Sequence, residues 1–304
     1  MATQNIDRGK NPAPNPPSSA VAQFRALHES GCFILPNPWD IGSAKYLHHL
    51  GFKALATTSA GFAFSRGLPD STNALTLEEV LTHVVEITAV TPLPVNADFQ
   101  SGYADDPEGV AKNVALCVRA GAAGLSIEDS TGNETSRLYK RAEAIERIRA
   151  ARTSIDETKI PAVLTARCEA LLVGERDPER TILDRLTAYA DAGADCLYAP
   201  GVREPEMISA IVKAVAPKPV NVQVSSPLRE LSLARLTDLG VRRVSVGSAL
   251  ARVAWTSFIR AARSIAETGT FDAFEGAVPF SELNSIFQSQ EHSHNTAGGV
   301  AAIR

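Results

Sequence analysis

Short apolar runs alternate with longer amphipathic segments over most of this chain of 304 residues. The short runs are rich in valine, isoleucine and leucine, which is typical of parallel strands buried on both faces. The longer segments carry apolar residues at helical spacing and predict amphipathic helices. Strands are expected at 33–36, 54–58, 94–98, 124–128, 161–166, 195–199, 219–224 and 243–247. The clearest helices are expected at 76–90, 106–120, 137–152, 178–192 and 248–267.

Glycine and proline mark the boundaries between these elements. Gly121 and Gly193 are two of the glycines that end a helical pattern just before a strand, where glycine adopts a left-handed C-cap without steric cost. The alternation predicts a parallel sheet with right-handed crossovers, and eight units in about 250 residues predict a single (β/α)8 barrel. A doubly wound open sheet is the alternative. It usually has a glycine-rich phosphate loop after the first strand, whereas this chain has Pro-Asn-Pro-Trp-Asp at 36–40.

The two ends of the chain differ in composition from the middle. Residues 1–19 are rich in proline, asparagine and serine, and residues 289–304 are polar with a glycine-rich stretch. Such segments bury too little apolar surface to fold by themselves. We therefore predict a disordered arm at 1–19, one barrel domain at 20–288 and a flexible tail at 289–304.

Charge and composition exclude several classes of function. The net charge of -4 and the pI near 5.9 argue against binding to nucleic acid or to an anionic membrane, which needs a basic face. No apolar stretch reaches the length of about 20 residues that a membrane span requires, and no secretory signal is evident. Cysteines at 32, 117, 168 and 196 form no CxxC pair. These features predict a cytoplasmic protein with buried, reduced cysteines.

Polar residues close several of the predicted strands. Asn96 and Asp98 are two positions apart and face the same side of a strand. Glu128 ends the next strand, and Asp129 after it would cap or brace the following loop. In a parallel barrel, such side chains converge on one mouth. The carboxylates of Asp98 and Glu128 suit Mg²⁺, often through water. The simpler alternative is that these acids only cap the helices that follow.

Arg167 closes an apolar strand in the same way. A guanidinium in such a place is costly unless an anion meets it. A two-pronged hydrogen bond to a substrate carboxylate would satisfy it, and so would an internal ion pair with Glu128 or Glu169; the two interpretations are not exclusive. Small residues at Ser59-Ala60-Gly61 would let backbone N–H groups approach an anion, although a plain turn uses the same residues. No histidine falls at a predicted strand end, which argues against histidine catalysis and a zinc site.

At these residues the chain resembles the isocitrate lyase/phosphoenolpyruvate mutase superfamily. The similarity covers roughly residues 24–287, and its segments in this order and spacing are specific. They are Gly67-Leu68-Pro69-Asp70, Val95-Asn96-Ala97-Asp98, the run from Ala120 to Asp129, Thr165-Ala166-Arg167 and Val220-Asn221.

The resemblance implies a (β/α)8 barrel whose last helix is exchanged between subunits of a dimer or tetramer. It also implies Mg²⁺ and 2-oxo or 2-hydroxy acid substrates that react through an enolate-like intermediate. Carried over position by position, Ser59, Ala60 and Gly61 would hold a substrate carboxylate, and Asn221 would contact the substrate through its amide. Asp70, Asp98 and Glu128 fall in the metal-associated acidic set, and Arg167 falls at the carboxylate-binding arginine.

The chain also departs from this family pattern. Asn96 stands where many members have a second aspartate, which removes one negative charge from the metal site. The loop at 130–140 has no cysteine or histidine, although the carbon–carbon lyases have a proton-donating cysteine there. The stretch at 199–201 reads Ala-Pro-Gly instead of presenting the glutamate or histidine of the two main branches. The pattern is that of a phosphonomutase-like branch without the lyase cysteine loop.

These observations predict a Mg²⁺-dependent lyase or decarboxylase that cleaves a C–C bond of a small 2-oxo or 2-hydroxy dicarboxylic acid. Arg167, Asp70, Asn96 and Tyr103 form the predicted catalytic set, and the proton donor is water, Tyr103 or Tyr139. Two alternatives remain open. One is chemistry on the P–C bond of phosphonopyruvate-like compounds, and the other is a catalytically silent barrel that binds a carboxylic acid.

The C-terminal segment suggests how the chain associates. Residues 248–287 carry a long apolar helix and then several phenylalanines, which is more apolar surface than a terminal helix normally hides on its own barrel. We therefore expect a homodimer or homotetramer. The alternative is a closing helix followed by a lid.

Overall fold

A ring of eight parallel strands forms the centre of the computed structural model, which describes residues 18–72, 74–227 and 231–297. Neighbouring strands pair in chain order from β2 through β8, and β8 pairs with β1. The N–H of Ala56 donates to the carbonyl of Pro36 at 3.0 Å across the remaining seam. The strands are β1 (Phe33–Leu35), β2 (Leu55–Ala56), β3 (Val95–Asp98), β4 (Gly124–Glu128), β5 (Val163–Arg167), β6 (Cys196–Tyr198), β7 (Val220–Gln223) and β8 (Arg243–Ser245). The predicted (β/α)8 barrel is confirmed.

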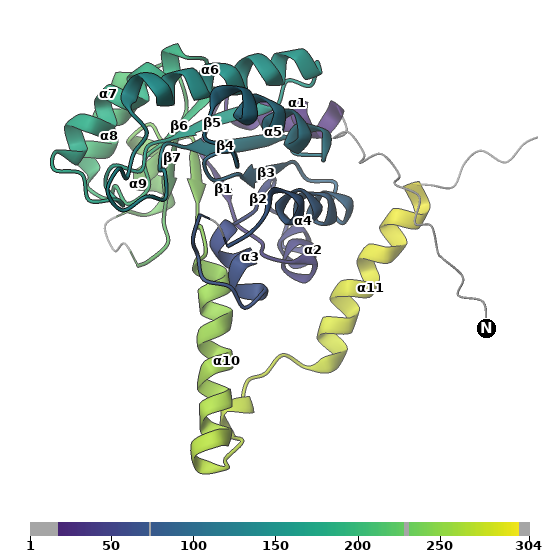
Figure 1. The fold of residues 1–304 in the computed structure, drawn as a ribbon. Coiled ribbons are helices and arrows are strands. Elements are labelled where there is room, and N and C mark those ends of the chain that lie inside the picture. The colour runs from purple at the N-terminus through teal and green to yellow at the C-terminus, as the bar shows by residue number, and fades with distance from the viewer. Residues whose placement is uncertain (1–17, 73, 228–230, 298–304) are drawn as a thin grey trace, which may run out of the picture.

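Helices follow the strands and surround the barrel (Figure 1). They are α1 (Ser18–Leu27), α2 (Ile41–His49), α3 (Ser59–Ser65), α4 (Leu77–Ala89), α5 (Pro107–Arg119), α6 (Arg141–Thr158), α7 (Pro178–Asp191), α8 (Pro205–Val215), α9 (Leu233–Asp238), α10 (Ala249–Thr268) and α11 (Phe280–Ala297), with a short 3₁₀ helix at Asp272–Phe274. Thr76 begins α4 with a reciprocal capping box to Glu79. Pro107 at the start of α5 supplies the preset backbone angle of a first helical turn.

The apolar faces of these elements meet in two main places. The larger core lies between the sheet and the surrounding helices and includes Val114, Leu125, Ile148 and Leu164. At the N-terminal end of the barrel, Val21 and Phe24 of α1 pack against residues at the starts of the strands. Helix α1 therefore covers this end, and the polar ends of the strands are left to form the opposite mouth.

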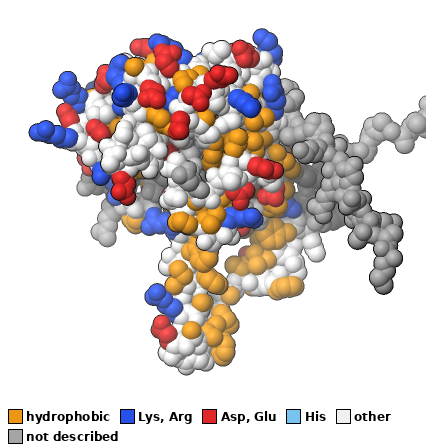
Figure 2. All heavy atoms as spheres, viewed as in Figure 1, with side chains coloured by type: hydrophobic (Ala, Val, Ile, Leu, Met, Phe, Trp, Pro, Cys, Tyr) orange, Lys and Arg blue, Asp and Glu red, His pale blue; other side chains and the backbone are white. Residues whose placement is uncertain are grey.

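The last two long helices are arranged differently from the others. In Figure 1, α10 projects away from the barrel, and α11 runs back toward α2. Figure 2 shows apolar side chains along the projecting part. Those of Val253, Phe258 and Phe280 are 64%, 61% and 82% exposed. No helix among the described residues combines the length and apolarity needed to cross a membrane.

The predicted boundaries of the barrel domain, at residues 20 and 288, differ from the ends of the first and last helices. Helix α1 already begins at Ser18, inside the segment expected to be a disordered arm, and residues 1–17 lie outside the described residues. Helix α11 continues to Ala297, into the segment expected to be a flexible tail. Both predicted boundaries thus fall within helices.

Candidate active site

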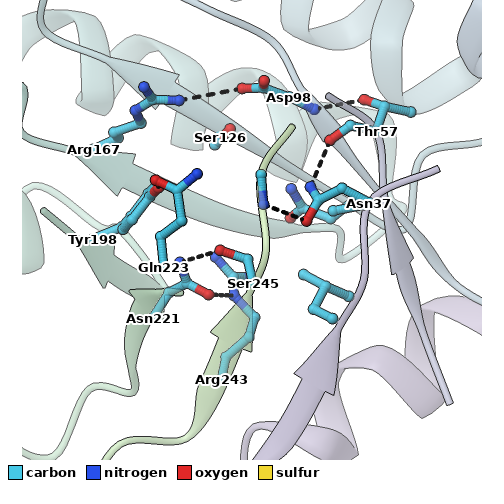
Figure 3. A pocket seen from close by; sticks show the side chains of 14 residues that line it. Asn37, Thr57, Asp98, Ser126, Arg167, Tyr198, Asn221, Gln223, Arg243 and Ser245 are labelled. Carbon is cyan, nitrogen blue, oxygen red and sulfur yellow. Dashed lines mark hydrogen bonds and ion pairs between the residues drawn. The ribbon is translucent and has the colours of Figure 1, made fainter. Parts of the chain in front are cut away.

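A pocket opens at the end of the barrel where the strands finish (Figure 3). All eight strands or the residues just after them contribute to its wall, as the convergence of parallel strand ends requires. Its polar lining consists of Asn37, Thr57, Asn96, Asp98, Ser126, Arg167, Tyr198, Asn221, Gln223, Arg243 and Ser245.

Arg167, the last residue of β5, is surrounded by carboxylates. Its Nη1 lies 3.5 Å from Asp98 Oδ1 and 3.4 Å from Glu128 Oε2. Its Nε donates to Oε1 of Glu169. The guanidinium also lies 5.4 Å from the ring centre of Tyr198, within cation–π range. The internal ion pairs considered for Arg167 are therefore both present.

Asp98, Glu128 and Glu169 form an acidic cluster around Arg167, with three carboxyl groups for one guanidinium. Burial raises the pKa of Glu128 to about 8 although Arg167 opposes the shift. Burial also raises the pKa of Glu169. The raised pKa of Glu128 means that this buried group favours binding a proton, and a divalent cation would take the place of that proton. Carboxylate oxygens are the donors that Mg²⁺ prefers.

The possible metal ligands beside Arg167 are carboxylate oxygens, which suit a hard cation such as Mg²⁺. Among the described residues, no group of three or more histidine, cysteine, aspartate or glutamate side chains is arranged to hold an ion. Mg²⁺ typically takes only one or two carboxylates and keeps several waters. Asp98 and Glu128 are the two carboxylates that could serve in this way.

Asp98 is held firmly in place from two sides. The N–H and hydroxyl groups of Ser59 donate to its Oδ2 at 2.9 and 2.8 Å. Its own N–H donates to Thr57 Oγ1 at 2.9 Å. The segment from Thr57 to Ser59 therefore orients this carboxylate toward Arg167.

The wall formed by β7 and β8 has a different character. Arg243 Nε donates to Asn221 Oδ1 at 2.9 Å, and Asn221 Nδ2 donates to Ser245 Oγ at 3.0 Å. The hydroxyl of Tyr198 donates to Gln223 Oε1 at 2.7 Å. The pocket-lining residues of β7 and β8 thus include a cation, two amides and a hydroxyl but no carboxylate.

The family of this barrel follows from its similarity to known proteins. The sequence pattern of the phosphoenolpyruvate phosphomutase family matches residues 24–266. The chain belongs to the isocitrate lyase/phosphoenolpyruvate mutase superfamily. This superfamily is one of enzymes, and its members include carbon–carbon lyases.

Several relatives in the superfamily are informative. A 2-methylisocitrate lyase of Salmonella typhimurium is 36% identical over 56% of this chain and 60% of its own length. An oxaloacetate decarboxylase of Pseudomonas aeruginosa is 33% identical over 75% of this chain and 79% of its own. A Burkholderia cenocepacia structure, provisionally assigned as a lyase or mutase, is 46% identical with a TM-score of 0.85, covering 89% of this chain and 96% of that one. Oxaloacetate acetylhydrolase with the product oxalate is 29% identical with a TM-score of 0.80, covering 93% and 100%.

The superfamily resemblance singled out the segment that begins α3. Ser59 reaches the site through Asp98, whereas Ala60 and Gly61 do not line the pocket. Gly61 is required for packing, because an added Cβ would lie 2.6 Å from Thr58 Cγ2. Asp70 lies on the exposed loop after α3, where partial burial of its carboxyl group and the charge of Asp98 raise its pKa.

Tyr103 lies beside the acidic cluster but outside the pocket lining. Its hydroxyl is buried without a hydrogen-bond partner, and burial followed by the charge of Asp98 raises its pKa. The residue has a φ of +54°, a left-handed conformation that costs energy for a non-glycine residue. Asn113 holds it there by donating to the Tyr103 carbonyl at 3.0 Å.

Asp129 braces the loop after β4. It accepts hydrogen bonds from Arg185 Nη1 at 3.0 Å, from the Tyr189 hydroxyl at 2.6 Å and from the Glu169 N–H at 2.8 Å. Because Glu169 contacts Arg167, this buried network fixes the strand ends that carry the acidic cluster.

Four residues predicted to lie at this mouth line the pocket: Asn96, Asp98, Arg167 and Asn221. Glu128 contacts Arg167 from outside that lining. Tyr198 and Arg243 were not expected at the site. The available signal for Arg243 was a charged residue within a predicted apolar strand, and for Tyr198 it was a polar group at a strand end.

Proposed function

We propose that this protein is a Mg²⁺-dependent carbon–carbon lyase or decarboxylase acting on a small 2-oxo or 2-hydroxy dicarboxylic acid. The observation that carries this proposal is the meeting of Arg167 with Asp98 and Glu128, at 3.5 and 3.4 Å, beside one pocket. The names of the relatives, 2-methylisocitrate lyase and oxaloacetate decarboxylase, support the same substrate class.

Two positive charges would bind the substrate: the guanidinium of Arg167 and the Mg²⁺ ion. Arg167 binds a substrate carboxylate in place of some of its present acidic partners. Asp98 and Glu128 are the residues that would hold Mg²⁺, and the ion would supply positive charge next to the developing enolate oxygen. Asn96 and Asn221 offer amide groups that orient the substrate, and the braced loop of Asp129 keeps Arg167 in position.

Cleavage moves the electron pair of the broken C–C bond into an enolate-like intermediate, which then takes a proton. Water or Tyr103 is the proposed donor. Tyr139 is less suited to this role because its hydroxyl already donates to Asp105 Oδ1 at 3.0 Å. Tyr103 has an unpartnered hydroxyl next to the acidic cluster.

A second candidate is chemistry on the P–C bond of a phosphonopyruvate-like compound. It is favoured by the description of the matching family and by a Burkholderia cenocepacia structure provisionally assigned as a phosphonomutase, which is 33% identical. A third reading, a barrel that only binds a carboxylic acid, draws on Asn96 and on the absence of a loop cysteine at 130–140.

A substrate panel assayed with Mg²⁺ and then with a chelator tests these functions. We expect turnover of oxaloacetate or a methyl-substituted malate that stops when Mg²⁺ is removed. Release of phosphate from phosphonopyruvate, or its rearrangement, would instead establish the second candidate. Stabilisation by oxalate with Mg²⁺ but no turnover of any panel compound would contradict both enzymatic functions.

We also propose that the chain forms a homo-oligomer through its C-terminal helices. The exposed face of α10 includes Trp255, Phe258 and Ile259, and an apolar surface of this kind marks an association site. The resemblance stated above implies that a second copy would cover it by helix exchange. Light scattering at micromolar concentration should give a dimer or tetramer, and a monomer would contradict the proposal.

A further inference from the structure

Arg243 is a buried cation inside the barrel. It is the first residue of β8, is 2% exposed and lines the pocket. In Figure 3 it lies on the other side of the pocket from Asp98 and Arg167. A buried guanidinium is costly unless an anion compensates its charge.

The hydrogen-bond partners of Arg243 are all uncharged. Its Nε donates to Asn221 Oδ1 at 2.9 Å and its Nη2 to Thr165 Oγ1 at 3.0 Å. Its Nη1 faces His28 Nε2 at 3.4 Å. His28 Nδ1 lies 2.7 Å from the Phe24 carbonyl and so carries the ring proton. Burial, followed by the charge of Arg243, lowers the pKa of His28 to about 3, so this imidazole is neutral at physiological pH.

Two other buried arginines near the pocket have carboxylate partners, whereas the buried Arg147 donates to the backbone carbonyls of residues 101, 104 and 105. Arg167 contacts three carboxylates, and Arg185 pairs with Asp129 at 3.0 Å. The ion pairs formed within the described part of the chain do not include Arg243. Its charge therefore acts on the pocket without a fixed counter-ion.

The groups beside Arg243 also present donors. Asn221 has its oxygen committed to Arg243, and Gln223 has its oxygen committed to Tyr198. One N–H of the Asn221 NH₂ group already donates to Ser245 Oγ at 3.0 Å, so this amide has one further N–H to offer, and the NH₂ group of Gln223 is the second donor beside Arg243. A guanidinium has five N–H groups, and the three contacts of Arg243 leave two of them available.

We propose that Arg243, with the NH₂ groups of Asn221 and Gln223, forms a second anion-binding subsite for a carboxylate of the substrate. This inference rests on the proposed function, because it places the two ends of a diacid at opposite sides of one pocket. Arg167 and the acidic cluster take the 2-oxo or 2-hydroxy end. The Arg243 subsite takes the other carboxylate and so selects diacids over monoacids.

Calorimetric titration with succinate and butyrate tests the subsite without turnover. The two ligands have the same number of carbons and differ by one carboxylate. The wild-type protein should prefer succinate, and Arg243→Gln should weaken succinate binding by about 10- to 100-fold while leaving butyrate nearly unchanged. Arg242→Gln is the matched control, because Arg242 donates to the Gly31 carbonyl at 3.1 Å and does not line the pocket.

Several outcomes would overturn the subsite. One is a wild-type protein without a preference for succinate, and another is an equal loss for both ligands in Arg243→Gln. A chloride-dependent stabilisation that needs Arg243 but leaves the succinate preference intact would identify a free ion as the occupant. If Arg243→Gln does not fold, Arg243→Lys keeps the cation without the planar fork, and an unchanged preference in that variant contradicts the proposal. A normal succinate preference without turnover of any panel compound would refute only the proposed function.

Discussion

Two arginines inside the same barrel have opposite surroundings. Arg167 ends β5 and contacts three carboxylates, whereas Arg243 begins β8 and contacts only neutral groups. Both line one pocket. The difference follows from the elements that each guanidinium faces, because Arg167 meets the acidic residues that end β3 and β4. Arg243 instead meets an amide of β7, a hydroxyl of β5 and the imidazole of His28.

The balance of charged groups therefore differs between the two sides of the pocket. The mouth has more carboxylates than cations and so favours a bound cation. The wall at β7 and β8 has a cation without a carboxylate and so favours a bound anion. A substrate that brings a metal to one end and a carboxylate to the other would satisfy both regions at once.

Removing Arg167 should give the largest effect. Arg167→Ala takes away the carboxylate grip and leaves three neighbouring carboxylates without their shared cation. We expect kcat/KM to fall by roughly 100- to 1000-fold, measured by steady-state kinetics on the substrate that the panel identifies. Arg242→Ala removes the same charge outside the pocket and should retain activity. A loss of less than tenfold in Arg167→Ala would show that this cluster is not the reactive centre.

Removing Asp129 should turn a matched buried arginine into an unmatched one. Asp129→Ala leaves Arg185, which is 8% exposed, without its carboxylate, as Arg243 is. Breaking such a buried pair costs about 3–5 kcal/mol of unfolding free energy, which urea denaturation would measure. Asp156→Ala, at a surface pair with a side chain 67% exposed, should cost less than about 1 kcal/mol. Similar losses in the two variants would mean that burial does not set the cost of an unmatched charge here.

Lowering the pH should reduce the unfolding free energy of the protein, because His28 beside Arg243 resists protonation in the folded state. Its folded-state pKa is about 3, below the ordinary value of 6.5. Between these values the unfolded chain binds a proton that the folded chain does not, so the unfolding free energy falls as pH falls below 6.5. At pH 5 this contribution is at most about 2 kcal/mol. Urea denaturation at pH 7 and pH 5 should show a smaller pH dependence for His28→Gln, whose amide oxygen can still accept from Arg243. An unchanged pH dependence would contradict this assignment.

Most of the fold could be predicted from local sequence patterns. The expected strand at 124–128 coincides with β4, and the expected helix at 106–120 contains α5. Apolar runs and helical spacing are properties of neighbouring residues, so they can be read without knowing the tertiary arrangement. The boundaries were less accurate: β2 covers only Leu55–Ala56 of the expected 54–58, because pairing with β3 limits its ladder.

The sequence by itself determined the alternating elements, the barrel and the polar strand ends that line its mouth, since each of these depends on residues close together along the chain. Only the tertiary structure decided which charges are matched. The partners of Arg243 come from α1, β5 and β7, and those of Arg167 come from β3, β4 and the turn after β5. Barrel closure and the stagger of the strands set these cross-barrel neighbours, and neither leaves a mark in the local pattern of residues.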